Sequence, residues 1–256
     1  MPTLPKQRHI QRYGWIPDLP DARDLLFAPP PEHAQGLPPS IDLRPKMPPV
    51  YNQGQLGSCT ANAIAAAVEF AEMGEGAGEA TPSRLFIYYG ERQIEGTVGQ
   101  DSGAQIRDGI KVVATVGAPP ETDWPYDITK FSEKPPQQAY DDAAKSKAIQ
   151  YLSVASNYVK GALAVDFPVV IGFTVYTGFE SPEVAQTGVL NLPAKGEQVV
   201  GGHAVLVVGY EDSSQRFIVR NSWGEGWGQA GYFTMPYAYL LNPSLSSDFW
   251  TIRQVD

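Results

Sequence analysis

The chain is poor in cysteine, histidine and charge. Its 256 residues include one cysteine and three histidines, and charged residues make up 18% of the total. A single cysteine excludes any disulfide within the chain, so the fold has to be stabilised by packing. So few thiols and imidazoles also give no cluster with the ligand spacing of a zinc site. The sequence therefore predicts no metal and no cofactor.

Basic residues and long apolar runs are scarce as well. Lys and Arg number 19 against 28 Asp and Glu, giving a net charge of −9. This balance argues against a nucleic-acid or anionic-membrane partner, because both attract clustered Lys and Arg. No stretch reaches the roughly 18 apolar residues of a membrane span, and residues 1–10 lack the apolar core of a signal peptide. We expect a chain that is cytoplasmic, or exported with its signal absent from this sequence.

Proline is concentrated at the start of the chain. Residues 1–50 hold 12 of the 23 prolines, and proline fixes φ and removes a backbone donor, so extended or turn-like structure is expected there. We interpret residues 1–38 as a pro-like extension on a main domain of residues 39–256. The extension also carries apolar side chains that need a groove: Tyr13, Trp15, Ile16, Leu19, Leu25, Leu26 and Phe27.

The main domain changes character halfway. An Ala-rich stretch at about 58–73 is apolar almost all round, which predicts a buried central helix. The patterns indicate further helices at about 83–93, 104–116 and 136–148. Short Val-, Ile-, Phe- and Tyr-rich runs then predict strands, at 167–175, 202–210, 217–220, 231–235 and 249–255. This segregation predicts an α+β fold with a helical lobe of about 50–150 and a β lobe of about 151–256.

Four polar side chains in this domain form a candidate catalytic set. Cys59 begins the first helix, where the helix dipole and unpaired N–H groups favour a thiolate. His203 is the only histidine outside the extension, and Asn221 could accept a hydrogen bond from its ring. Gln53 and the Cys59 N–H could stabilise an oxyanion. Taken singly, these four could be an inert core thiol, a structural histidine, a turn asparagine and a surface glutamine.

The order and spacing of these residues resemble the papain family. The resemblance is carried by Gln53-Gly54, Gly57-Ser58-Cys59, Gly202-His203-Ala204, Asn221-Ser222-Trp223-Gly224, Trp227-Gly228 and Gly231-Tyr232. The cysteine and histidine are 144 residues apart, within the family's range of roughly 130–150.

The resemblance implies a two-lobed cysteine endopeptidase with its cleft between the lobes and a peptide or protein as substrate. Cys59 would be the nucleophile, His203 its base and Asn221 the residue that orients it, with Gln53 and Cys59 forming the oxyanion hole. Ser102, Gly103, Gly202 and Trp223 would contact substrate, and Trp223 would also cover the bond between His203 and Asn221.

The resemblance also has departures and leaves alternatives open. Thr60 stands where the family usually has an aromatic residue, and Leu56 where many members have a disulfide cysteine. A pocket lined by residues near Ile171, Gly172 and Gly202 is expected to be apolar, with no acid evident. Amidase or transpeptidase activity on the same site, or a catalytically silent binding protein, are the alternative functions. We further hypothesise that residues 1–38 occupy the cleft as the enzyme's own inhibitor.

Overall fold

The computed structural model describes residues 13–30, 36–76 and 80–255, and its centre is one antiparallel sheet. The strands run in the order β2-β7-β3-β4-β5-β6, with β1 paired to β4 outside this path. Their bounds are β1 Ser40–Asp42, β2 Ala148–Ser153, β3 Val169–Tyr176, β4 Val199–Glu211, β5 Arg216–Arg220, β6 Tyr232–Pro236 and β7 Ser246–Val255. The predicted α+β class is confirmed.

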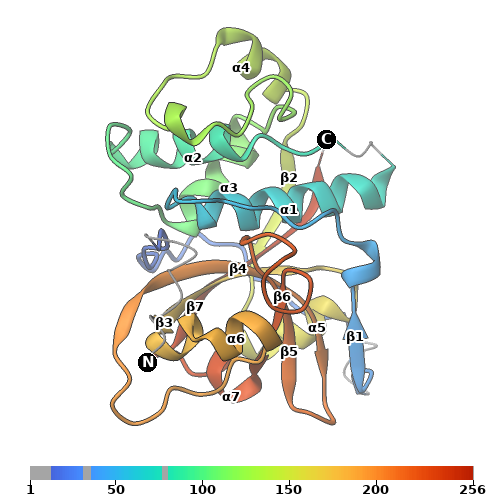
Figure 1. The fold of residues 1–256 in the computed structure, drawn as a ribbon. Coiled ribbons are helices and arrows are strands. Elements are labelled where there is room, and N and C mark those ends of the chain that lie inside the picture. The colour runs from blue at the N-terminus through green and yellow to red at the C-terminus, as the bar shows by residue number, and fades with distance from the viewer. Residues whose placement is uncertain (1–12, 31–35, 77–79, 256) are drawn as a thin grey trace, which may run out of the picture.

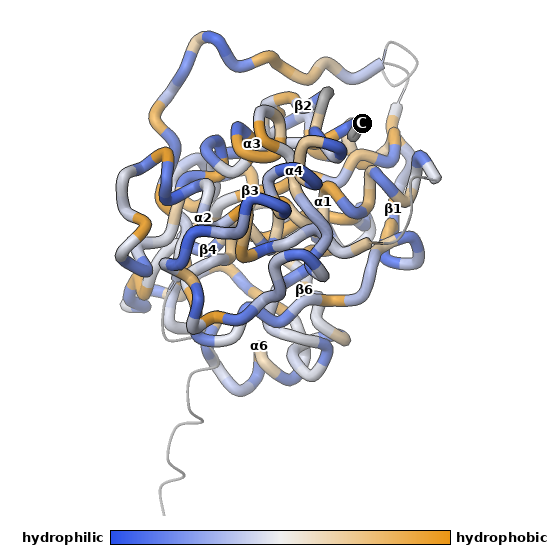
Figure 2. Tube along the Cα trace, turned by 90° about the horizontal axis from the view of Figure 1, so that it is seen from above, coloured by the Kyte–Doolittle hydropathy of each residue, from blue (hydrophilic) through white to orange (hydrophobic). Residues whose placement is uncertain are grey.

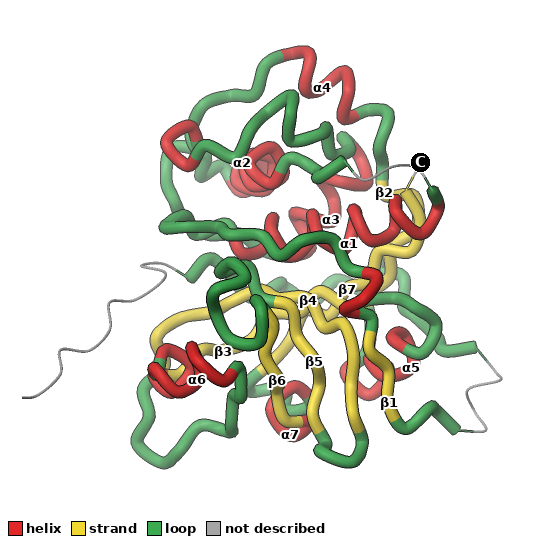
Figure 3. Tube along the Cα trace, turned by 45° about the vertical axis from the view of Figure 1, so that its right-hand side comes forward, coloured by secondary structure: helices red, strands yellow, loops and turns green. Residues whose placement is uncertain are grey.

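The longer helices lie on one side of this sheet. Figures 1 and 3 show α1 to α4 stacked above β3 to β6, with β2 beside these helices and α5, α6 and α7 around the lower part of the sheet. The helices are α1 Cys59–Glu75, α2 Arg84–Glu95, α3 Ile106–Thr115, α4 Gln137–Ala143, α5 Val159–Leu163, α6 Pro182–Thr187 and α7 Tyr237–Leu240. Among the described residues, no helix is long and apolar enough to cross a membrane.

Helix α1 is the central helix that the Ala-rich run predicts. It contacts β4 and β7 on one side and α2 and α3 on the other, so small side chains face neighbours in every direction. Its side chains are buried from Cys59 to Glu69, and it ends at Gly76, whose φ of 72° closes the last turn. The first residue of α1 is thereby held at the junction between the helices and the sheet.

The expected helix at 136–148 is wrong at its end. Helix α4 stops at Ala143, and the carbonyl of Ser146 accepts a hydrogen bond from Ala118 N at 3.0 Å. The chain then enters strand β2, which pairs with β7. The sequence predicts neither strand β1 nor the short helices α5 to α7, because each is too short to show a period of its own. Strand β2 is also not predicted, since the expected helix extends to its first residue.

The N-terminal segment follows the outside of the molecule. Figure 2 shows the chain passing near α3 and β2 before residues 31–35, in alternating apolar and polar stretches. Leu26 forms a parallel bridge with Ser153 of β2, and Phe27 is buried while Leu25 and Leu26 stay exposed. The remainder of the predicted extension, residues 1–12 and 31–35, lies outside the described residues.

The contact between α1, α2 and α3 predicts a strong effect at Gly109 of α3. A Cβ there would lie 2.3 Å from Ile64 Cδ1 and 2.4 Å from Glu91 Oε1. We expect Gly109→Ala to lower the free energy of unfolding by about 1–3 kcal/mol through overpacking. Urea denaturation measures it. The matched control is Gly74→Ala in α1, where a Cβ would meet no atom of the other described residues within 4 Å beyond the helix's own backbone and where we expect a gain of about 0.5–1 kcal/mol. Equal effects at the two glycines would contradict this account.

Candidate active site

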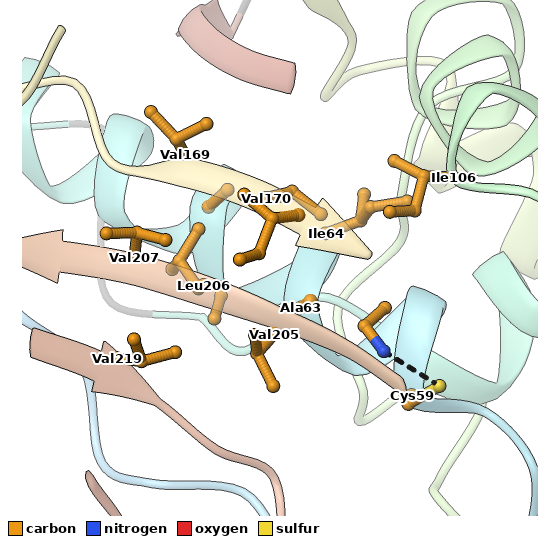
Figure 4. Close-up of a cluster of buried hydrophobic side chains, with 14 of the residues drawn as sticks. Cys59, Ala63, Ile64, Ile106, Val169, Val170, Val205, Leu206, Val207 and Val219 are labelled. Atoms are coloured by element: carbon orange, nitrogen blue, oxygen red, sulfur yellow. Dashed lines mark hydrogen bonds between the residues drawn. The ribbon is translucent and has the colours of Figure 1, made fainter. Parts of the chain in front are cut away.

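Cys59 lies where α1 meets the strand that carries His203. Its sulfur accepts a hydrogen bond from the backbone N–H of Ala204 at 3.4 Å, drawn as the dashed line in Figure 4. Cys59 is fully buried. As the first residue of a 17-residue helix, it also has a backbone N–H that the helix itself leaves without a partner. The structure thus brings the thiol of the helical half next to the residue that follows His203.

His203 is held by a side-chain amide and covered by an indole. Its Nε2 lies 2.8 Å from Asn221 Oδ1, and the same oxygen accepts from Ser222 N at 2.8 Å. Because that oxygen is an acceptor, Nε2 carries the hydrogen and Nδ1 is the free acceptor nitrogen. Within the described part of the chain, Nδ1 is buried and has no hydrogen-bond partner. The Trp223 ring lies 5.1 Å from the imidazole at 34°, which keeps water from the bond between His203 and Asn221.

Gln53 joins the loop before α1 to the segment that carries Asn221. Its side-chain oxygen accepts from Ser222 Oγ at 2.6 Å, and its Nε2 donates to the carbonyl of Leu56 at 2.9 Å. The backbone N–H of Gln53 also donates to Ser222 O at 2.9 Å. The amide is fully buried, and its nitrogen has a second hydrogen for a further acceptor. The structure places Gln53 in the loop before α1 as a buried, hydrogen-bonded amide, and its predicted function in an oxyanion hole stays a prediction.

Burial keeps both ionisable groups neutral in this structure. It raises the pKa of Cys59 to about 11, against the smaller lowering effect of N–H groups from Ala204, Gly14 and Thr60. It lowers the pKa of His203 to about 4, opposed by the hydrogen bond to Asn221. A thiol is a strong nucleophile only as thiolate. The buried pair is therefore a neutral thiol and a neutral imidazole near pH 7.

A short segment of the extension lies directly over Cys59, and we call residues 13–18 the strap. Gly14 O accepts from Ala104 N at 2.7 Å, and Ile16 N donates to Ala104 O at 3.0 Å. On the other side, Trp15 N donates to Gly202 O at 3.1 Å. A Cβ on Gly14 would lie 1.7 Å from Gly57 O, so only glycine fits this close to the nucleophile loop.

Trp15 fills the pocket expected from the sequence, but that pocket contains an acid. Its ring lies against Gly172 and Gly202, where a Cβ would come within 2.0 and 2.6 Å of it. The indole Nε1 donates to Asp248 Oδ2 at 2.9 Å. The expectation of a pocket without an acid is therefore wrong. Asp248 is far from these glycines in sequence, and only the pairing of β3 with β7 brings it beside Gly172.

The strap makes its backbone hydrogen bonds to the loop before α3 through Ala104, whereas the sequence predicts Ser102 and Gly103 as the residues that contact substrate. Ser102 Oγ donates to Thr97 Oγ1 at 2.9 Å and to Gly103 O at 3.1 Å, and Gly103 N donates to Tyr88 Oη at 3.1 Å. Ala104, which was not predicted, makes the backbone hydrogen bonds to the strap. Gly103 still lies against Gly14, since a Cβ on it would be 2.3 Å from Gly14 O. Substrate contacts by Ser102 and Gly103 stay a prediction.

Both ends of the strap are anchored by polar side chains. Tyr13 Oη donates to Glu180 Oε1 at 2.5 Å, and its ring meets the His203 ring edge-on at 5.8 Å. At the other end, Asp18 N donates to Asp248 Oδ2 at 2.8 Å. The Asp18 carboxylate accepts from Trp250 Nε1 and Arg107 N, both at 3.2 Å. No sequence pattern indicates these anchors, because their partners come from distant elements.

Comparison with known proteins identifies the family. The sequence model described as papain family cysteine protease matches residues 37–240. A peptidase C1-like protein of Acanthamoeba polyphaga mimivirus is 40% identical over 272 residues, covering 96% of this chain and 88% of that protein. Cathepsin J of Mus musculus is 29% identical over 213 residues, and the match spans 78% of this chain and 62% of cathepsin J.

Comparison with solved structures gives the same family. The crystal structure of xylellain, a cysteine protease from Xylella fastidiosa, has a TM-score of 0.90 and 45% sequence identity, covering 99% of this chain and 100% of that one. Digestive procathepsin L 3 of Tenebrio molitor shares the fold, with a TM-score of 0.69 at 20% identity over 90% of this chain and 74% of that one. The chain belongs to the papain family, and it is a cysteine peptidase.

Proposed function

We propose that this protein is a cysteine endopeptidase that uses Cys59, His203 and Asn221, and that its strap keeps it latent. The observation that carries the first part is the position of the Cys59 sulfur. It lies at the start of α1, 3.4 Å from the backbone nitrogen that follows His203. The observation that carries the second part is the fully buried state of that sulfur beneath Gly14.

The proposed reaction begins when the strap leaves. Water and substrate then reach Cys59 and His203, and the desolvation that keeps both neutral is relieved. The thiol proton moves to His203 Nδ1, which has no competing hydrogen bond from any residue that the structure describes. The helix N-terminus and the new imidazolium both favour the thiolate. Asn221 keeps the ring in place by accepting from Nε2 throughout.

The thiolate would then attack a peptide carbonyl. The second N–H of the Gln53 amide and the backbone N–H of Cys59 would stabilise the oxyanion. His203 returns its proton to the leaving amine, which leaves an acyl group on the sulfur. Water, deprotonated by His203, attacks this thioester, and release of the acid restores the thiol. Both half-reactions use the same imidazole as base and then as acid.

The contacts of Trp15 support a substrate preference. Its indole combines a flat apolar body against Gly172 and Gly202 with a donor that reaches Asp248. A substrate side chain in this pocket should likewise have an apolar body for the two glycines and a hydrogen-bond donor for Asp248. We therefore propose a preference for side chains with an apolar stem and a donor at the tip, rather than for purely aliphatic ones.

The chemical class has a direct test. We expect a Cys-directed epoxide inhibitor to add once to the strap-released chain, at Cys59 by peptide mass mapping. Labelling should fall at least about a hundredfold in His203→Ala, because base catalysis is typically worth this much. Hydrolysis of a fluorogenic peptide should fall in parallel, and Cys59→Ser gives the background. Labelling without turnover would favour a silent binding protein, and aminolysis exceeding hydrolysis with an added amine would favour transpeptidase activity.

Latency predicts that a single strap residue controls access to the thiol. In the full chain, Trp15→Ala removes the ring from its pocket and the bond to Asp248. We expect peptide hydrolysis and Cys59 alkylation by iodoacetamide to rise at least about tenfold, since losing a buried aromatic side chain costs several kcal/mol of docking. Deletion of residues 1–38 should raise both further. The matched control is Leu19→Ala, whose side chain is 75% exposed. A folded Trp15→Ala chain with unchanged alkylation would count against latency.

The strap's anchor at Asp18 makes docking depend on pH. Burial and the nearby Asp248 raise the pKa of docked Asp18 to about 7, while hydrogen bonds from Arg107 and Trp250 and the Arg107 charge lower it. Burial also raises the pKa of Asp248. When the strap leaves, Asp18 returns to its usual pKa of about 4. Docking is therefore strongest below pH 4, weakens as pH rises towards 7, and is constant above it.

Asp18→Asn tests this dependence in the full chain. The neutral amide removes the cost of docking an ionised carboxylate, so Cys59 alkylation should be at least about tenfold slower than in the native chain at pH 7.5. The two rates should converge near pH 4.5. Taking their ratio cancels the ionisation of the thiol itself. Asp21→Asn, a change in the same segment, is the control. A ratio that is flat from pH 4.5 to 7.5 would refute the effect.

A further inference from the structure

Asp101 belongs to the loop of residues 96–104 and reaches across to the loop before α1. Its Oδ1 and Oδ2 accept from the backbone N–H of Gly57 at 3.0 and 3.3 Å. Gly57 is two residues before the nucleophile. The same Oδ1 accepts from Tyr88 Oη at 2.6 Å. Tyr88 Oη in turn accepts from Gly103 N at 3.1 Å, so one phenol and one carboxylate connect the Cys59 loop to the loop of Ala104.

The approach of Asp101 to Gly57 leaves no spare room. A Cβ on Gly57 would lie 2.9 Å from Asp101 Oδ1 and 3.6 Å from Tyr88 Oη. The carboxylate therefore lies against the backbone itself, and the position of Gly57 is set by it. Because Ser58 and Cys59 follow directly, any shift of Gly57 moves the Cys59 N–H that is proposed to bind the oxyanion.

The other end of this connection is rigid as well. The Arg92 guanidinium lies over the Tyr88 ring at 3.9 Å from its centroid. Its Nη1 donates to Val98 O at 2.8 Å and to Gln100 O at 3.1 Å. Arg92 is fully buried. Tyr88 and the loop of residues 96–104 are thus fixed from behind, which makes Tyr88 a firm support for Asp101.

From these contacts we propose that Asp101 is a positioning residue of the peptidase, acting through Gly57 on the nucleophile and through Tyr88 on the substrate-binding loop. This deepens the proposed function and rests on it. The chain has a single cysteine, so no disulfide can hold the loop of Gly57 in place. Asp101 joins Gly57 to the facing loop by hydrogen bonds instead, so the site is held together without a covalent bond.

The two halves of the connection predict separable kinetic effects. In the full chain carrying Trp15→Ala, Asp101→Ala should lower kcat per active site at least about tenfold, because small displacements of reacting groups are costly. Asp101→Asn keeps an acceptor for Gly57 N and should stay within about threefold of the parent kcat.

Tyr88→Phe keeps the hydrogen bonds between Asp101 and Gly57 but removes the acceptor of the Gly103 N–H, so it should raise KM by about threefold or more with little change in kcat. Active sites are counted by epoxide titration, which removes any effect of misfolded protein.

Each result decides the proposal. An unchanged kcat per titrated site in Asp101→Ala, or a loss in Asp101→Asn as large as in Asp101→Ala, overturns it. Should Asp101→Ala fail to fold, Tyr88→Phe decides alone: a raised KM with kcat retained supports the connection, and an unchanged KM refutes it. Absence of hydrolysis in the parent chain and in native protein overturns the peptidase function, and the positioning role with it.

Discussion

The contact between the N-terminal end of α1 and strand β4 is the constraint on which the site depends. Across it, the Ala204 N–H reaches the sulfur of Cys59. The helix is buried from Cys59 to Glu69 and the strand is paired on both edges by β3 and β5, so neither can shift alone. The thiol and the imidazole come from two halves of the chain, and the packing of helix on sheet brings the thiol to the residue that follows His203.

The strap binds to the same helical and sheet surfaces that form the site, and in the proposed function it blocks access to Cys59. Its backbone bonds to Ala104 on the helical side and to Gly202 on the sheet side, and so bridges the two halves over the nucleophile. The resulting burial disfavours charge on both Cys59 and His203. In the proposed function, latency is thus a solvation effect more than a displacement of catalytic groups. The site can be assembled and still be unreactive.

The sequence predicted the elements whose signals are local. The Ala-rich α1 and the Val-rich β3 and β4 follow from their own residues, and the α+β class and the family follow from their order. The Glu180, Asp248 and Arg107 anchors could not be predicted, because each pairs with the strap from more than 80 residues away. The sequence predicted a backbone contact at Gly103, whereas Ala104, one residue later, makes the hydrogen bonds to the strap. Nothing in the sequence shows that the Gly103 N–H already donates to Tyr88 Oη.

The irregular pairing of β7 with β3 has a further meaning for the pocket that Trp15 fills. The register shifts between Val170, opposite Trp250, and Gly172, opposite Ser247, so β7 has one extra residue in this stretch. Asp248 lies in the bulge, in a left-handed conformation with φ of 59°. Its side chain is therefore released from the alternation of the strand. Because asparagine and glycine also adopt this conformation readily, either could replace Asp248 and remove the acid from the pocket with little disturbance of the sheet.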